Sequence, residues 1–250
     1  MDKKDLDILK VTKWECPDEV GVPLITMPNI PKPLHGKGCQ PRTIMGSTKW
    51  DKTRKLCYFK ANYKCEICGC DPAKGDLHSH ELFSVDYLEG YTEFKRYIAL
   101  CRTCHDAIHS GRLITLYKEG NLMYPKSYVL KVVEHAFSLV HKYNKENPEA
   151  NLRLFDTFVE YLKVPELKSE MLRLIQKYNI KFYKSPKRCA KWPLWRMIWN
   201  GKEYKTPYAT PEDWLKAMET ASKNDTARKV KDRFTGGIFD EIDKIIAENA

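Results

Sequence analysis

Residues 65–68 read Cys-Glu-Ile-Cys, and residues 101–104 read Cys-Arg-Thr-Cys. A Cys-x-x-Cys turn lets two thiolates bind one ion, and two such turns complete the tetrahedral shell that structural zinc prefers. Such a closed shell has no open position, so the ion should brace the fold rather than react. Cys70 could replace Cys68, although that spacing is rarer. We therefore expect a structural Zn²⁺ bound by Cys65, Cys68, Cys101 and Cys104.

The remaining use of cysteine favours metal binding over disulfides. The chain has nine cysteines, an odd number, and its start, MDKKDLDILK, lacks the apolar stretch of a signal peptide. The sequence has no run of about 18 apolar residues, so no transmembrane helix is expected. We therefore expect a cytoplasmic protein that does not bind a membrane. The scattered cysteines should be buried or free thiols: Cys16, Cys39, Cys57 and Cys189.

The charge balance favours a polyanionic partner. The 250 residues include 43 Lys and Arg against 33 Asp and Glu, and the formal charge is +10. One acid, Asp51, lies between Pro31 and Lys64. Nine basic residues share that stretch: Lys32, Lys37, Arg42, Lys49, Lys52, Arg54, Lys55, Lys60 and Lys64. A solvated basic face remains the plain alternative to a binding surface.

Patterning divides the chain into four segments. Residues 1–46 are expected to form an extended, proline-rich arm, because three prolines in residues 27–36 oppose both helix and regular sheet. Residues 47–113 hold the cysteines and form a core. Residues 114–185 carry apolar stripes at helical spacing, and residues 186–250 form an accessory hairpin and helix unit. The expected fold class is therefore α+β, mainly α.

Within the core, a helix is expected over about residues 50–63, with Ser47 or Thr48 as its cap. Short strands are expected over 76–83 and 97–100. A helix over 102–110 should follow and be stopped by Gly111.

The last segment has three signals of its own. Asn200-Gly201 lies between Trp195–Trp199 and Lys202–Thr206 and predicts a type I′ hairpin. Thr210 should cap a helix that begins at Pro211. The tail over 236–247 spaces isoleucines helically, so it could dock on the body or pair with a second copy as a homodimer.

Histidines gather around the second cysteine pair. His105 and His109 are four residues apart, so both fall on one face of the expected helix. Two imidazoles at that spacing can bind one ion. The zinc site should hold this helix against the strand that carries His78, His80 and Glu81.

These motifs resemble the zinc-stabilised branch of the HNH endonucleases, of bacterial and phage type, whose core is a ββα-metal unit. The likeness rests on Cys65-Glu-Ile-Cys68-Gly69, Leu77-His-Ser-His-Glu-Leu82, Leu100-Cys-Arg-Thr-Cys-His105 and His109. It covers roughly residues 46–113, and the earlier PNIPKPLHG also looks like the lead-in of some such proteins.

The resemblance implies hydrolysis of phosphodiester bonds, with DNA as the expected substrate. It implies that His80 is the general base and that His105 and His109 bind a catalytic divalent cation (Mg²⁺, Mn²⁺, Ni²⁺ or Zn²⁺). The basic helix would grip the nucleic-acid backbone through Lys52, Arg54 and Lys55. Arg112 or Lys64 would hold a flanking phosphate.

Two departures from the family pattern leave alternatives open. The family often carries an Asp-His or His-His pair on the first strand, whereas this chain has His80-Glu81. His80 could therefore be a ligand instead, with Glu81 as the base or a ligand, and His78 is a third candidate. Arg96 stands where the family usually has an asparagine. Asp86 could orient a histidine. The competing hypothesis is a catalytically inactive zinc module that binds nucleic acid or protein.

Overall fold

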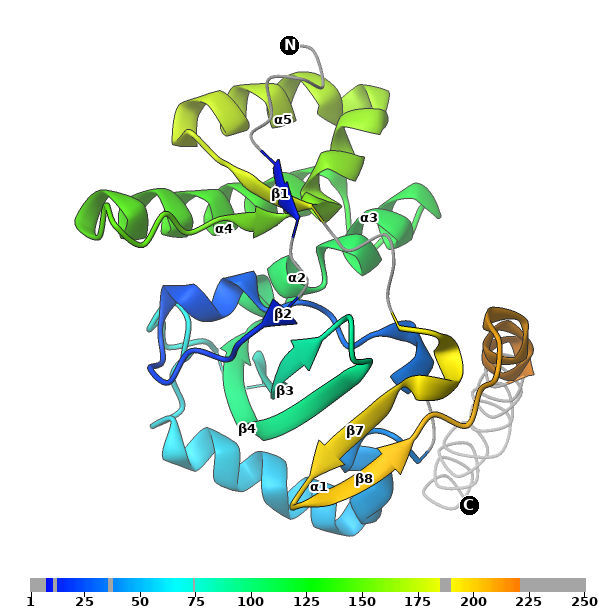
Figure 1. Ribbon diagram of the computed structural model, residues 1–250. Coiled ribbons are helices and arrows are strands. Elements are labelled where there is room, and N and C mark those ends of the chain that lie inside the picture. Colours follow the sequence, from blue (N-terminus) through cyan, green and yellow to red (C-terminus); the bar gives the residue numbers. More distant parts are fainter. Residues whose placement is uncertain (1–7, 11–12, 36–37, 74, 185–189, 221–250) are drawn as a thin grey trace, which may run out of the picture.

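The structure is a computed structural model that describes residues 8–10, 13–35, 38–73, 75–184 and 190–220 (Figure 1). The fold is α+β with helix as its main component, as predicted. Cys189 and the tail at 236–247 lie outside the described residues. Within the described ranges, no helix is both long and apolar enough to cross a bilayer.

A five-stranded sheet carries the cysteine and histidine motifs. Its central pair is antiparallel, runs in register from Leu77↔Cys101 to Asp86↔Tyr91, and shifts once, between Leu82 and Phe83. The strand order is β2-β3-β4-β7-β8. The strands are β2 (Lys13–Trp14), β3 (Leu77–Asp86), β4 (Tyr91–Cys101), β7 (Arg196–Trp199) and β8 (Lys202–Lys205).

Both core strands are longer than the prediction from sequence. The expected strand at 97–100 covers only the buried end of β4. Its outer half carries Glu93 and Lys95, which form an ion pair with each other and conceal the strand pattern. Asp86 begins the connecting turn, because its Oδ1 accepts hydrogen bonds from the backbone N–H groups of Leu88 and Glu89, each at 2.9 Å.

The C-terminal hairpin extends the central sheet. Asn200 and Gly201 have φ values of 50° and 71°, which confirms the predicted turn. β7 pairs in parallel with β4, starting at Tyr91↔Arg196. The predicted helix after Pro211 is also confirmed, and Thr210 and Asp213 cap it reciprocally.

A long helix, α1 (Pro41–Lys60), lies beneath the sheet (Figure 1). It begins earlier than the expected 50–63 and is kinked at Gly46, where φ is 76°. It also ends earlier, because Asn62 and Tyr63 adopt left-handed backbone with φ of 50° and 57°. This change of direction turns the chain into Cys65.

The predicted stop at Gly111 is wrong. The first helix, α2 (Arg102–Ile108), ends at Ile108, and the second, α3 (Ser110–Lys118), begins after His109 and contains Gly111. A glycine costs a helix only about 1 kcal/mol relative to alanine, so packing can override it. Here Ser110 bonds Thr157 at 2.7 Å and ties the start of α3 to the neighbouring segment.

The helical half is more mixed than the expected run of helices. It contains α4 (Lys126–Glu146), the 3₁₀ helix η4 (Asp156–Lys163) and α5 (Pro165–Tyr178). It also contains a small parallel sheet in the order β1-β6-β5, whose strands were not predicted in the helical region or in the N-terminal arm. Its strands are β1 (Ile8–Lys10), β5 (Leu154–Phe155) and β6 (Phe182–Lys184).

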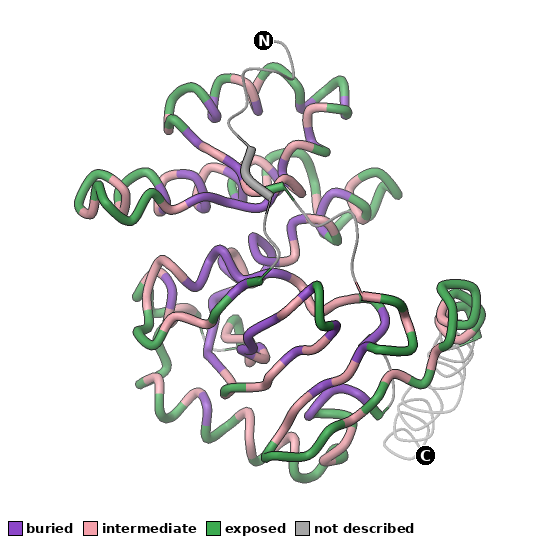
Figure 2. The backbone as a smooth tube through the Cα atoms, viewed as in Figure 1, coloured by how far each residue is buried: buried purple, intermediate pink, exposed green. Residues whose placement is uncertain are grey.

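One continuous core joins the two halves (Figure 2). The predicted stripe of α4 is buried, with Val129, Val133 and Phe137 fully enclosed. The N-terminal segment contributes Leu24 and Leu34, which are also fully buried. This segment packs against the body around the 3₁₀ helices η2 (Val22–Thr26) and η3 (Lys32–Leu34).

Candidate functional site

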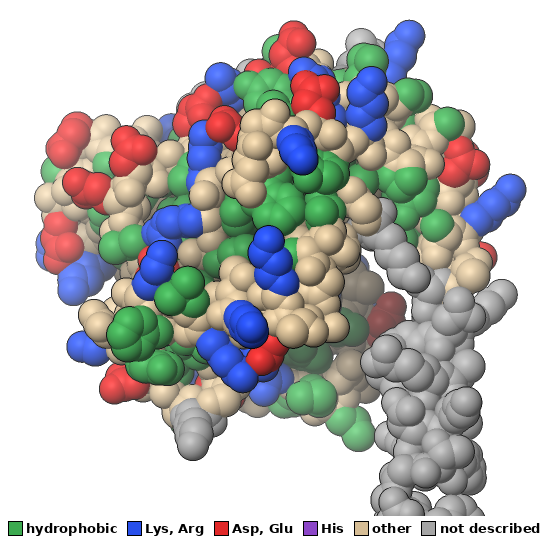
Figure 3. Space-filling view, turned by 90° about the horizontal axis from the view of Figure 1, so that it is seen from below, with side chains coloured by type: hydrophobic (Ala, Val, Ile, Leu, Met, Phe, Trp, Pro, Cys, Tyr) green, Lys and Arg blue, Asp and Glu red, His purple; other side chains and the backbone are tan. Residues whose placement is uncertain are grey.

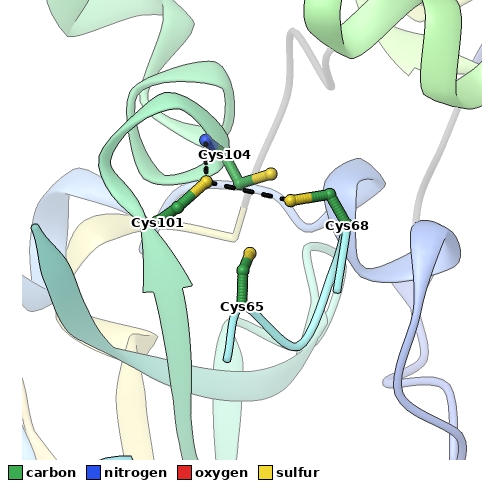
Figure 4. Close-up of side chains that lie close together, drawn as sticks. All are labelled: Cys65, Cys68, Cys101 and Cys104. Carbon is green, nitrogen blue, oxygen red and sulfur yellow. Dashed lines mark hydrogen bonds between the residues drawn. The ribbon is translucent and has the colours of Figure 1, made fainter. Parts of the chain in front are cut away.

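Four cysteine side chains converge at the junction of β4 and α2 (Figure 4). Their sulfur atoms all lie within 4.8 Å of one another, and those of Cys68 and Cys101 are 3.9 Å apart. Sulfurs about 2.3 Å from a shared tetrahedral ion lie roughly 3.8 Å apart. Cys65, Cys68, Cys101 and Cys104 therefore fit one metal ion, and zinc is the ion their chemistry favours.

Backbone contacts hold the first cysteine turn against β4. The N–H of Gly69 donates to the Cys65 carbonyl at 2.8 Å, and Gly69 has the left-handed φ of 71° that the turn requires. Glu66 then accepts from the N–H of Ala99 at 2.7 Å, while its own N–H donates to the Ala99 carbonyl at 2.9 Å. Cys70 is exposed and lies outside the cluster.

A histidine of the helical half reaches the cysteine cluster. His135 on α4 places Nε2 3.2 Å from the sulfur of Cys104. An imidazole N–H at this position can donate to a thiolate and reduce its charge. Only the packing of α4 against α2, far apart in sequence, shows this contact.

Three histidines form a second cluster. His80 comes from β3, His105 from α2 and His109 from the residue after α2. One ligand atom of each lies within 4.8 Å of the others. The Nε2 atoms of His80 and His109 are only 3.1 Å apart, and the ring centres of His105 and His109 are 4.6 Å apart. The structure thus brings together the three histidines that the sequence had singled out.

The proton of His80 is fixed by its neighbour. Its Nδ1 lies 2.7 Å from the backbone carbonyl of Glu81. A carbonyl oxygen only accepts hydrogen bonds, so Nδ1 carries the proton in the neutral ring. The Nε2 atom that faces His109 is left with a lone pair.

Burial keeps this pair of histidines neutral. It lowers the pKa of His80 to about 3 and that of His109 to about 2, with the neighbouring imidazoles acting in the same direction. The side chain of His80 is 6% exposed. Neutral imidazoles are the form that binds metal ions.

We expect acid to destabilise the protein because of these two histidines. Below about pH 6.5 these histidines bind protons in the unfolded chain but not in the folded protein. Their contribution to the free energy of unfolding is therefore complete above that pH and falls as the pH drops towards the folded pKa values. Between pH 7.5 and 5.5, the two units centred on the unfolded pKa, each histidine should contribute a total loss of roughly 1.4 kcal/mol. Urea unfolding of zinc-loaded protein between pH 7.5 and 5.5 measures the slope.

The matched variant for this measurement is His109→Gln, which keeps a polar side chain without a titrating ring. Its total loss of stability between pH 7.5 and 5.5 should be smaller than that of the wild type by about 1.4 kcal/mol, so its slope should be shallower. Equal slopes would show that His109 takes up protons equally in both states. The comparison cancels acid effects on the cysteine cluster, which both proteins share.

Glu81 lies apart from the histidines. Successive strand residues face opposite sides, and the carboxylate of Glu81 lies 3.8 Å from Arg42 of α1. Burial raises the pKa of this carboxyl group. Its cross-strand partner, Tyr97, packs on Trp50 of α1, so this face of the hairpin belongs to α1. The Glu81 carboxylate therefore lies on the α1 face of β3, away from the imidazole of His80.

The other candidates have distinct positions. Arg96 donates to the Glu66 carboxylate at 2.7 Å and so supports the first cysteine turn. Asp86 caps the β3–β4 turn and does not orient a histidine. His78 stacks on His105, with ring centres 4.9 Å apart and an interplanar angle of 17°.

The predicted nucleic-acid contacts lie mostly on α1. Lys52 and Lys64 are exposed and form no ion pair within the residues that the structure describes, whereas Arg54 and Lys55 share Asp51. Arg112 lies exposed on α3, near the histidine cluster, where its charge acts on His109.

Asn29 was not identified from the sequence. Asn29 lies in the loop between η2 and η3. Its side chain contacts His109, with Oδ1 2.6 Å from Nδ1. The only available signal was its place in PNIPKPLHG, the segment noted as a typical lead-in. No spacing rule links it to a histidine 80 positions later.

The chain was compared with protein-family models, with curated proteins and with solved structures, and none of them matches. The relation to HNH endonucleases therefore stays a prediction from motifs. The two clusters and their surroundings are the basis for a functional proposal.

Proposed function

We propose that this protein is a metal-dependent endonuclease that hydrolyses phosphodiester bonds, with DNA as its substrate. The observation that carries the proposal is the convergence of His80, His105 and His109, in which two Nε2 atoms lie 3.1 Å apart. Such nitrogens rarely approach so closely unless a proton or a cation lies between them.

The histidine cluster fits a divalent cation. Two nitrogens about 2.0–2.1 Å from one ion lie roughly 3.0–3.4 Å apart, for octahedral and tetrahedral angles respectively. His80, His105 and His109 would hold Mg²⁺, Mn²⁺, Ni²⁺ or Zn²⁺, with imidazole favouring the last two. Such an ion, when bound, supplies Lewis-acid stabilisation of the charge on the phosphate and on the leaving oxygen.

A separate histidine is available to accept a proton. His80 was the base expected from sequence, but its Nε2 faces His109 inside the cluster and suits a ligand better. His78 lies on the same face of β3 and is half-buried, and its ring nitrogens have no hydrogen-bond partner among the described residues. Burial and His105 lower its pKa, so the ring is neutral at pH 7 and can take the proton of the attacking water.

The α1 face suits a nucleic-acid backbone. Figure 3 looks onto this side and shows Lys and Arg among exposed hydrophobic side chains. Phe59 and Tyr63 are 65% and 59% exposed, close in sequence to Lys52, Lys60 and Lys64. Cations neutralise phosphates, and exposed aromatic rings can stack on bases.

A second candidate function is an inactive zinc module that binds nucleic acid or protein. Two observations favour it: Glu81 is withdrawn to the α1 face, and Arg96 supports the cysteine turn instead of the histidine cluster. This reading predicts one zinc ion per chain and no second cation.

One experiment separates the two functions. Mg²⁺, Mn²⁺, Ni²⁺ and Zn²⁺ are each titrated by calorimetry into protein that holds one zinc ion, and supercoiled plasmid is incubated with each ion. The nuclease proposal expects one further cation per chain and conversion of the plasmid to nicked or linear forms. Absence of both under all four ions would overturn it in favour of the inactive module.

A further inference from the structure

We infer that Asn29 is a positioning residue that holds the proton of His109 on Nδ1 and so keeps Nε2 free for a cation. The inference rests on the proposed metal-binding role of the histidine cluster. It adds the N-terminal segment, which precedes the predicted core, to the parts of the chain that make the site.

The orientation of the Asn29 amide follows from an obligatory acceptor. Its Nδ2 lies 3.3 Å from the backbone carbonyl of Ile108, which can only accept, so the amide NH₂ must point there. Its Oδ1 therefore faces His109, at 2.6 Å from Nδ1. An amide oxygen also only accepts, so His109 must donate, and its proton is on Nδ1.

The same logic holds on the other side of the pair. His80 donates from Nδ1 to the Glu81 carbonyl, so both Nε2 atoms carry lone pairs that face each other at 3.1 Å. A neutral pair in this state has no proton to share. The two lone pairs repel each other until a cation satisfies both.

Asn29 excludes the other tautomer of His109, in which the proton is on Nε2. Without it, His109 can move its proton to Nε2 and donate a hydrogen bond to His80. That bond would satisfy both rings and occupy the nitrogens that a cation needs. The amide thus keeps the two imidazoles from bonding to each other.

The surrounding segment holds Asn29 rigidly. Met27 is buried against the core, and His35 bonds the Ile30 carbonyl at 2.9 Å. Thr206 donates to the Pro33 carbonyl and ties the segment to the C-terminal hairpin. A preorganised second contact of this kind usually changes metal affinity or activity by about 10–100-fold.

Two variants test the inference. Asn29→Leu removes both hydrogen bonds at similar size, and Asn29→Asp keeps the oxygen that accepts from His109. The matched control is Asn144→Leu, because the Asn144 amide also bonds the backbone twice, at Leu152, on another part of the fold. Zinc content and thermal melts establish that each variant is folded.

The first readout is the ¹⁵N NMR spectrum of the histidine rings in zinc-loaded protein without a second cation. Wild type, Asn29→Asp and Asn144→Leu should show His109 with its proton on Nδ1, and Asn29→Leu should show a shift towards Nε2–H. A wild-type His109 with its proton on Nε2, or an unchanged tautomer in Asn29→Leu, would overturn the inference.

The second readout is the affinity for Mn²⁺ measured by calorimetry. Asn29→Leu should bind about 10–100-fold more weakly than wild type, and Asn29→Asp within a few-fold of it. Equal affinity of wild type and Asn29→Leu would overturn the inference. Neither readout requires cleavage, so a protein that binds Mn²⁺ in this pattern but leaves DNA intact would contradict the nuclease proposal alone.

Discussion

Cys104→Ser is expected to lose its zinc and its cooperative unfolding transition. Cys104 is fully buried in the first turn of α2. Its sulfur lies within 4.8 Å of the other three cysteine sulfurs and 3.2 Å from Nε2 of His135. Structural zinc contributes roughly 10–16 kcal/mol of apparent binding free energy in small domains. Total stabilities are about 5–15 kcal/mol, so weakening the site can consume the whole margin.

Metal analysis and thermal melts by circular dichroism measure this effect. Cys70→Ser is the matched control, because Cys70 is adjacent to the same turn but exposed and outside the cluster. It should keep one zinc ion and a wild-type melting temperature. A Cys104→Ser protein with full zinc content and an unchanged melt would contradict the structural role of the cluster.

His109→Ala is expected to lose DNA cleavage by about 10³-fold or more, equivalent to roughly 4 kcal/mol of barrier. The variant removes one of three converging nitrogens and also leaves Asn29 without its partner. Its affinity for Mn²⁺ should fall with its activity. His141→Ala is the control, since His141 is exposed on α4, contacts Tyr178 and is not part of the histidine cluster.

A second variant separates cation binding from proton transfer. His78→Ala should reduce turnover by about 10²–10⁴-fold while leaving Mn²⁺ affinity near that of the wild type. Full activity of folded His109→Ala would remove the histidine cluster from the mechanism. Full activity of His78→Ala would return the role of base to His80.

Local sequence patterns predicted the centre of the fold correctly. The two cysteine turns, the Asn200-Gly201 hairpin and the stripe of α4 depend on residues within a few positions of one another. Their side-chain chemistry and spacing therefore carry enough information. The convergence of His80 with His105 and His109 also followed, because the cysteine turns join their two elements.

Non-local pairing explains what was missed. β5 has two residues and β1 and β6 have three each, too short to show a period. The parallel pairing of β7 with β4 likewise joins segments about 100 positions apart, and the Asn29–His109 contact joins residues 80 positions apart. Gly111 was misjudged because its helix is stabilised by a contact with η4.

The N-terminal strands have a consequence for the order of folding. β1 and β2 are close neighbours in sequence, yet β1 pairs with β6 near residue 182 and β2 pairs with β3 near residue 85. During synthesis β1 must wait until residues 182–184 have emerged before its partner exists. Contacts of such sequence separation slow folding, so the small sheet should form later than the β3–β4 hairpin.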